Sequence, residues 1–186
     1  MIDDSPLIQI IDAALAEAAS KAGAWLRCRP GCSECCLGVF EISALDAERL
    51  RRGLLRLAVR DPAQAARVRA RASVAAAGLR SRFPIDTAQR VLGEAPDDDD
   101  PCPVLDPATG TCDLYESRPL VCRAFGPAIR SGDAVGTCEL CFAGATEEEI
   151  AAAAVALDPD AIEIPFLREF AGDRPAAPTI VALALG

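Results

Sequence analysis

Apolar residues recur at helical spacing near the start of the chain. From Leu7 to Ala22 they fall three or four residues apart, which places them on one face of a helix. Ser5 and Pro6 stand where a helix cap and a first helical residue are favoured. The pattern therefore predicts an amphipathic helix that ends near Gly23.

Two further helices are expected in the next part of the chain. Ser43, with Asp46 three residues later, is typical of a helix start, and leucines follow at helical spacing. A second helix, rich in alanine and arginine, is expected from Pro62 to about Arg82. Residues 84–93 are compatible with one more short helix.

Turn-forming residues interrupt the helical pattern in the middle of the chain. The sequence CPVLDPATGTCDLY, from Cys102 to Tyr115, predicts a small β-hairpin with its turn at Asp106–Gly110. Ser117 is then expected to cap a short helix that carries Cys122.

The C-terminal part of the chain returns to a helical pattern. Thr146 and Glu149 have the spacing of a capping box at the start of an alanine-rich helix. The apolar tail PTIVALALG, residues 178–186, is expected to pack on the core as a strand or helix, with docking to a partner protein as the alternative.

These elements predict a mainly α fold: a small helical domain with cysteine-rich metal-binding loops and one short β-hairpin. We expect a single domain over residues 1–186, because the length suits one core and no long linker is present. Within it, residues 1–24 form an N-terminal helix, residues 28–141 a cysteine-rich metal-binding region, and residues 142–186 a C-terminal helical extension.

Charge and composition exclude several classes of partner. The net charge of −9 disfavours nucleic acid and anionic lipid, which both require a basic surface. The N-terminus lacks the basic region of a secretory signal, and no apolar run reaches the roughly 18 residues of a membrane span. We therefore expect a cytoplasmic protein, in which stable disulfides are rare.

Nine cysteines and no histidine carry the candidate chemistry. Sites built from sulfur alone suit structural zinc or an iron–sulfur cluster, and they do not suit magnesium or calcium. The alternatives to metal ligation are a disulfide framework and simple packing of the thiols in the core. The candidate metal ligands are Cys28, Cys32, Cys35, Cys36, Cys102, Cys112, Cys122, Cys138 and Cys141.

The motif CRPGCSECC, followed by CPVLDPATGTCDLYESRPLVCRAFG, resembles the YkgJ family, also called the CxxCxxCC domain. The resemblance spans residues 28 to about 141 and implies a zinc- or iron-chelating domain without a settled activity. The first gap between cysteines is three residues here, where the family name implies two.

Two arginines flank Cys122 and are candidate cofactor-binding residues. Arg118 and Arg123 could donate charge-assisted hydrogen bonds to thiolates, or they could form ordinary surface ion pairs. The aspartates at 97–100 lack the ligand spacing of a calcium loop and are expected to be a solvated charged loop.

No catalytic constellation is evident, so an enzymatic activity is left open. The alternative to metal binding alone is a redox or cluster-dependent enzyme, either a thiol oxidoreductase or a protein-modification partner. The CELC sequence has the dithiol spacing of oxidoreductases, but the alternating strand–helix pattern of those enzymes is missing. Cys28, Cys32 and Cys35 share the spacing of radical SAM enzymes, yet strand patterns are too few for their barrel.

The adjacent thiols of Cys35 and Cys36 are expected to point in different directions, because neighbouring side chains diverge in both strands and helices. We therefore predict two centres. Cys32 and Cys35 would belong to one, and Cys36 would join Cys102, Cys112 and Cys122 in the other, with Cys28 or Cys141 to spare.

Overall fold

The chain divides into two units, the first formed by residues 1–29 and 120–173 and the second by residues 30–119 and 174–186. A computed structural model describes residues 2–83, 88, 100–173 and 176–186. The short helix expected at 84–93 falls almost wholly outside the described residues, as do the aspartates at 97–99.

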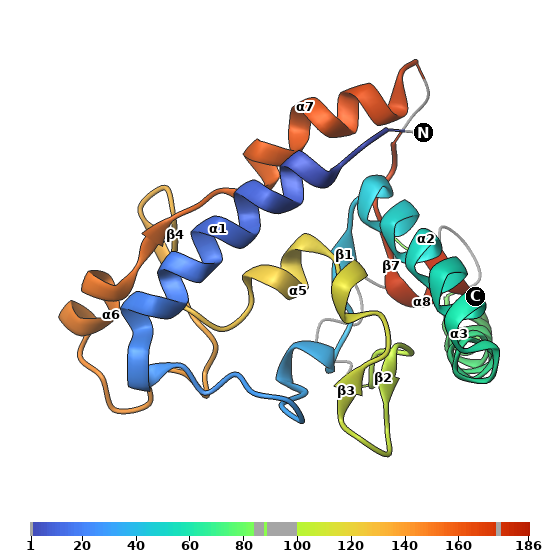
Figure 1. Ribbon diagram of the computed structural model, residues 1–186, viewed down its shortest axis with the longest axis horizontal. Helices are drawn as coiled ribbons and strands as arrows, with labels where there is room; N and C mark the ends of the chain where they lie inside the picture. Colours follow the sequence, from blue (N-terminus) through green and yellow to red (C-terminus); the bar gives the residue numbers. More distant parts are fainter. Residues whose placement is uncertain (1, 84–87, 89–99, 174–175) are drawn as a thin grey trace. The chain divides into compact units, whose positions relative to one another are not determined.

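The long helix α1 (Ser5–Ala22) organises the first unit. Its apolar face is buried against α5 (Leu120–Ala124), α6 (Glu147–Ala153) and α7 (Pro159–Ala171), which lie along it in Figure 1. Asp4, rather than Ser5, occupies the cap position, and Ser5 is the first helical residue. The predicted helix is therefore confirmed, with its cap one residue earlier.

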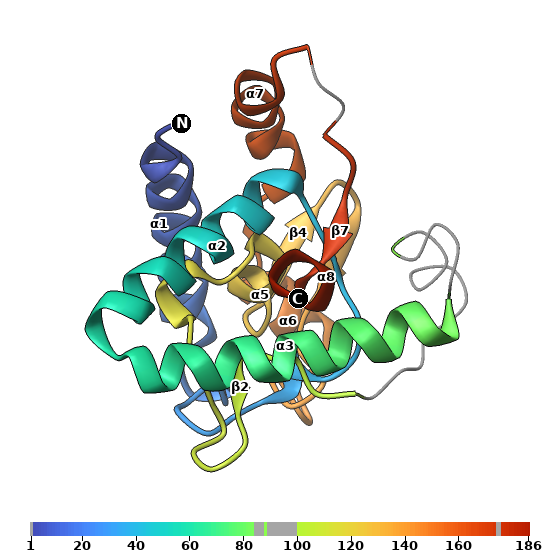
Figure 2. The ribbon, with the colours of Figure 1, turned by 90° about the vertical axis from the view of Figure 1, so that its right-hand side faces the viewer.

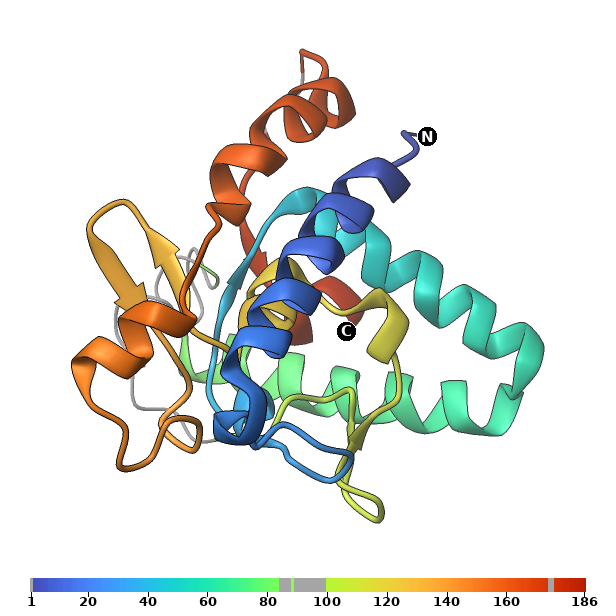
Figure 3. The same ribbon diagram turned by 60° about the vertical axis from the view of Figure 1, so that its left-hand side comes forward.

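A small sheet completes this unit. The strands β4 (Ile129–Ser131) and β5 (Ala134–Gly136) form an antiparallel hairpin, and β6 (Val155–Ala156) adds to β4 in parallel. Figure 3 shows this hairpin beside α6. Sequence patterning did not predict the sheet, because its strands are only two or three residues long. The capping box of α6 is present as expected between Thr146 and Glu149.

The antiparallel helices α2 (Ala44–Arg60) and α3 (Pro62–Arg82) dominate the second unit. The Ser43 side chain accepts a hydrogen bond from the Asp46 amide at the start of α2. Asp61 ends α2 and also caps α3, because its carboxylate accepts a hydrogen bond from the Gln64 amide. A single residue thus connects the two helices, which packs them side by side (Figure 2).

The apolar tail packs within the second unit. The strand β7 (Thr179–Ile180) pairs antiparallel with β1 (Glu41–Ile42), and α8 (Val181–Leu185) lies against α2 and α3 in Figure 2. The Ile180 side chain is buried, and the Arg51 side chain donates to the Ala184 carbonyl. The packing interpretation of this segment is therefore confirmed.

The predicted hairpin is present, with β2 (Leu105–Asp106) paired to β3 (Thr111–Cys112). A 3₁₀ turn over Tyr115–Ser117 follows it. Ser117 does not cap α5 as expected, because it lies inside this turn and its hydroxyl accepts a hydrogen bond from Arg56. The helix α5 nevertheless carries Cys122.

The described residues therefore form a mainly helical fold with a few short strands, as the sequence predicts. No helix among them is long and apolar enough to cross a membrane.

Candidate metal centre

The nine cysteines divide between the two units. Five lie in the second unit, on the loop after residue 30 and on the β2–β3 hairpin. They are Cys32, Cys35, Cys36, Cys102 and Cys112. The first unit holds the other four, which are Cys28, Cys122, Cys138 and Cys141.

Backbone hydrogen bonds bring the first cysteine cluster to the start of the hairpin. The Cys102 amide donates to the Cys36 carbonyl at 2.7 Å, and Leu37 forms an isolated antiparallel bridge with Pro101. Cys35 and Cys36 close a 3₁₀ turn over Glu34–Cys36, after which the chain becomes extended. These contacts place the Cys35–Cys36 pair beside Cys102.

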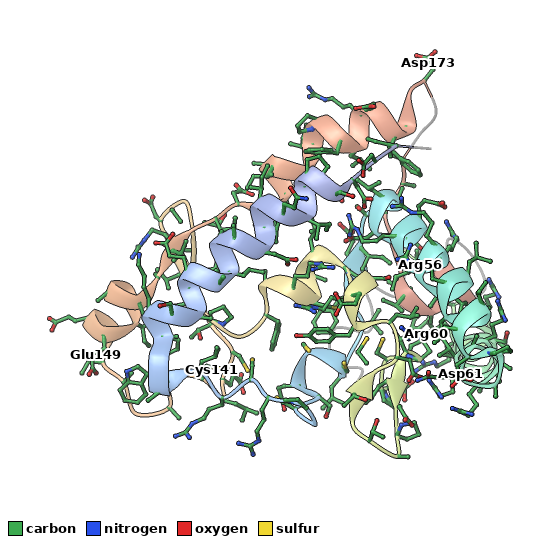
Figure 4. The ribbon with its side chains drawn as sticks, viewed as in Figure 1. Arg56, Arg60, Asp61, Cys141, Glu149 and Asp173 are labelled. Atoms are coloured by element: carbon green, nitrogen blue, oxygen red, sulfur yellow. The ribbon has the colours of Figure 1, made fainter. Side chains whose placement is uncertain are left out.

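The hairpin then adds Cys112 to the same group. Cys112 is paired with Leu105 across the two strands, and the Leu105 amide donates to the Cys102 carbonyl at 2.9 Å. Both Cys102 and Cys112 pack against the apolar core that includes Leu50 and Val104. In Figure 4, sulfur atoms gather near the hairpin.

The loop that carries Cys32 approaches the other end of the hairpin. Gly110 has a positive φ of 65°, and a Cβ placed there would lie 3.3 Å from the Gly31 carbonyl oxygen. Glycine is favoured at both positions because it tolerates positive φ and allows this close approach. The turn of the hairpin thereby contacts the loop before the first cluster.

The four grouped thiols perturb one another. The pKa of Cys35 is lowered to about 6, chiefly because the Cys36 thiol is hydrogen-bonded to its sulfur. The same hydrogen bond, burial and the nearby sulfurs of Cys35, Cys102 and Cys112 raise the pKa of Cys36. The two adjacent thiols therefore contact each other, and the expectation that they diverge is wrong.

Burial dominates at the two hairpin thiols. It raises the pKa of Cys102 to about 12, with the sulfurs of Cys112 and Cys35 adding to the effect. Burial also raises the pKa of Cys112, again with a contribution from Cys35. Ionising these thiols costs free energy for two reasons: the thiolate charge is buried, and neighbouring thiolates repel one another. A cation bound between them offsets both costs and therefore favours the thiolate forms.

This donor set fits zinc or iron. Both metals accept shells made only of thiolate, and sulfur is the sole soft donor that this histidine-free chain offers. Among the described residues, no three Cys, Asp or Glu side chains are already gathered closely enough to constitute a metal site. An ion bound by these four thiols would therefore require their side chains to move closer together.

Arg118 lies beside this group. Its guanidinium stacks on the Tyr115 ring, 3.8 Å from the centroid, and donates to the Tyr115 carbonyl at 3.2 Å. Its positive charge adds to the lowering of the pKa of Cys35 and offsets part of the rise in the pKa of Cys112. Arg123 belongs to the first unit, where its Nη1 donates to both carboxylate oxygens of Asp12 at 2.8 and 3.0 Å.

A second set of cysteines lies in the first unit. Cys138 and Cys141 are buried, and the Cys141 sulfur accepts a hydrogen bond from the Arg27 amide at 3.5 Å. A Cβ on Gly126 would lie 2.6 Å from the Cys28 sulfur, and the Gly126 carbonyl accepts from the Cys138 amide. Gly126 is therefore close to both the Cys28 side chain and the Cys138 backbone. Figure 4 labels Cys141.

Sequence reasoning missed a polar network on α3 that holds the hairpin. Arg71 and Gln64 both donate to the Asp113 carboxylate, at 2.5 and 2.6 Å. Asp113 directly follows Cys112, and a carboxylate beside a candidate ligand is the one signal that could have pointed to it. The partners on α3 are distant in sequence and carry no such signal.

Thiols that the backbone brings together are typical of cysteine-based metal-binding proteins. Over residues 27–141, more than half of its length, the chain matches the sequence profile of the CxxCxxCC family, described as "Putative zinc- or iron-chelating domain". The chain therefore belongs to this family. Searches of curated proteins and of solved structures gave no match.

Proposed function

We propose that the chain binds a zinc or iron ion through the thiolates of Cys35, Cys36, Cys102 and Cys112. The observation that carries the proposal is the grouping of these four sulfurs, whose pKa values are shifted by one another. They come from two segments that are far apart in sequence and that are joined by the Cys102–Cys36 hydrogen bond. An ion there would tie the first cluster to the hairpin, which is a structural role.

Arg118 supports this proposal by supplying compensating charge. Four thiolates around a divalent ion carry a net charge of −2, which is costly to bury without nearby donors or cations. The guanidinium of Arg118 is held in place by Tyr115 and already favours the thiolate forms of Cys35 and Cys112. The corresponding role for Arg123 remains a prediction from sequence. Cys32, which the sequence also predicts as a ligand, lies outside the proposed shell of four thiolates.

A second ion is proposed for the first unit, with Cys28, Cys138 and Cys141 as ligands and Cys122 as the candidate fourth sulfur. Its support is the approach of Cys28 and Cys138 to Gly126, together with the sulfur of Cys141, which contributes to the raised pKa of Cys138. Burial is the main cause of that raised pKa. A buried thiol with a raised pKa is a poor nucleophile, which disfavours the oxidoreductase alternative for CELC.

Metal analysis and a visible spectrum of protein purified without oxygen test the proposal. Iron with sulfide and thiolate charge-transfer bands would identify a cluster, and a colourless protein with stoichiometric zinc would identify a zinc site. Cys36→Ser and Cys112→Ser should each remove the ion of the second unit. Cys32→Ser is the matched control, and it should retain the ion. Full metal content in Cys36→Ser and Cys112→Ser would contradict the proposed ligands.

A further inference from the structure

Arg71 on α3 contacts both segments that carry the hairpin cysteines. Its Nε donates to the Pro103 carbonyl at 2.9 Å, and its Nη2 donates to the Asp113 carboxylate at 2.5 Å. Pro103 directly follows Cys102, and Asp113 directly follows Cys112. One guanidinium therefore bridges the residues next to two proposed ligands.

The bridge is largely shielded from water. The Asp113 side chain is 3% exposed and the Arg71 side chain 25% exposed, so their ion pair is weakly screened by solvent. The other carboxylate oxygen of Asp113 accepts from the Gln64 side chain at 2.6 Å. Gln64 and Arg71 lie seven residues apart and hence on one face of α3. Both oxygens of the buried carboxylate are thus held by one rigid helix.

The hairpin needs such support, because its ladder contains only two residue pairs. An isolated hairpin of this length is marginal in water. A planar guanidinium presents its donors in a fixed fork, so two acceptors bound to it are held at a defined separation. The fork therefore restrains the Cys102 and Cys112 backbones before any ion binds.

We propose that Arg71 is a positioning residue of the metal centre, which sets the separation of Cys102 and Cys112 through its bonds to Pro103 and Asp113. This inference rests on the proposed function of the second unit. Groups that orient metal ligands typically contribute 10–100-fold to metal affinity. Arg71 acts through the backbone next to the ligands rather than by touching the sulfurs.

The test compares Arg71→Gln and Arg71→Lys with the control Arg69→Gln, an exposed position on the same helix. Cobalt(II) titration of the metal-free, reduced proteins gives the affinity and the thiolate-to-cobalt absorption spectrum. We expect Arg71→Gln to lose about 10–100-fold in affinity and to change the spectrum. Arg71→Lys keeps the positive charge but loses the forked guanidinium, so its cobalt affinity should also be lower than that of the wild type. Arg69→Gln should match the wild type.

Wild-type affinity and an unchanged spectrum in Arg71→Gln would overturn the inference, even if the thermal midpoint fell, because Arg71 would then be merely structural. If Arg71→Gln fails to fold, the same criteria apply to Arg71→Lys.

A second readout does not depend on metal. The Asp113 amide donates to the Val104 carbonyl at 2.8 Å, and its hydrogen exchange reports closure of the hairpin. In metal-free protein, hydrogen exchange of the Asp113 amide should accelerate in Arg71→Gln and not in Arg69→Gln. Equal exchange rates in the two variants would show that Arg71 does not restrain the hairpin. If Cys102→Ser and Cys112→Ser retain all bound metal, the proposed function fails instead, and this readout still decides whether Arg71 restrains the hairpin.

Discussion

At the scale of single residues, the pair Cys35 and Cys36 shows how local backbone decides thiol chemistry. The expectation that the two side chains diverge assumed a regular helix or strand. The pair instead closes a 3₁₀ turn that ends at Cys36, and the two thiols are hydrogen-bonded to each other. Adjacent sulfurs can therefore serve one group, and the proposed ligand set includes both.

This contact predicts unequal reactivity in the metal-free, reduced protein. With a pKa of about 6, Cys35 is mostly thiolate at pH 7, whereas Cys36 has a raised pKa and stays protonated. Because the thiolate is the nucleophile, iodoacetamide should modify Cys35 first, and the rate should fall as the pH drops below about 6. Peptide mass spectrometry after a brief pulse measures this. Equal labelling of both residues would contradict the proposed hydrogen bond.

Gly53 provides a second prediction at this scale. A Cβ at this position on α2 would lie 2.3 Å from the Ser117 hydroxyl oxygen, so Gly53→Ala forces the turn after the hairpin outward. We expect a loss of about 1–3 kcal/mol in the free energy of unfolding.

Gly78→Ala is the matched control, because Gly78 lies within α3 and nothing within 4 Å would meet its Cβ. That substitution should stabilise by about 0.5–1 kcal/mol. Denaturant titration of both variants measures the difference. If Gly53→Ala were as stable as Gly78→Ala, the close packing of α2 on Ser117 would be wrong.

At the scale of elements, local signals were readable and distant pairings were not. The starts of α2 and α6 follow from side chains within three residues, Ser43 with Asp46 and Thr146 with Glu149, and both caps are present. The pairing of β1 with β7 joins the two ends of the second unit. Two-residue strands carry too little pattern to predict such a pairing. The contact of Arg71 with Asp113 could not be predicted for a similar reason, since no local sequence rule links α3 to the hairpin.

The β1–β7 pairing gives a prediction for the apolar tail. Ile180 is 2% exposed and pairs with Glu41, so Ile180→Ala leaves a cavity beneath the strand. The expected loss is about 2–5 kcal/mol in the free energy of unfolding. Leu55→Ala in α2 is the control, because Leu55 is 63% exposed and should change stability by less than about 0.5 kcal/mol. Similar stability of the two variants would show that the tail is not packed.

At the scale of the whole molecule, the sequence identifies the cysteines as candidate metal ligands but does not predict which of them lie in the same unit. The family motif treats residues 27–141 as one stretch, whereas the structure places Cys28 in one unit and Cys32 in the other. Four residues of spacing do not reveal such a division, because it depends on which distant segments each side packs against. The prediction of a single domain over residues 1–186 is not tested by this division, since two compact units can still unfold together.

Unfolding experiments can test both the single domain and the role of the metal, because each unit contains one distinctive chromophore. Trp25, the chain's one tryptophan, stacks near Phe142 in the first unit, and Tyr115, its one tyrosine, lies in the second. If the chain is one domain, tryptophan fluorescence and tyrosine absorbance should give the same midpoint in metal-loaded protein.

Chelation under reducing conditions should then strongly lower the unfolding midpoint that tyrosine absorbance reports, called the tyrosine midpoint below. Apparent binding free energies of structural zinc are about 10–16 kcal/mol in small peptides, comparable to the roughly 5–15 kcal/mol stability of a typical domain. Cys112→Ser should lower the tyrosine midpoint as chelation does, since Cys112 lies in the unit that Tyr115 reports. Cys32→Ser, measured in the same unit, should keep the metal-loaded value. An unchanged tyrosine midpoint after complete removal of the metal would show that the ion does not hold the hairpin to the first cysteine cluster.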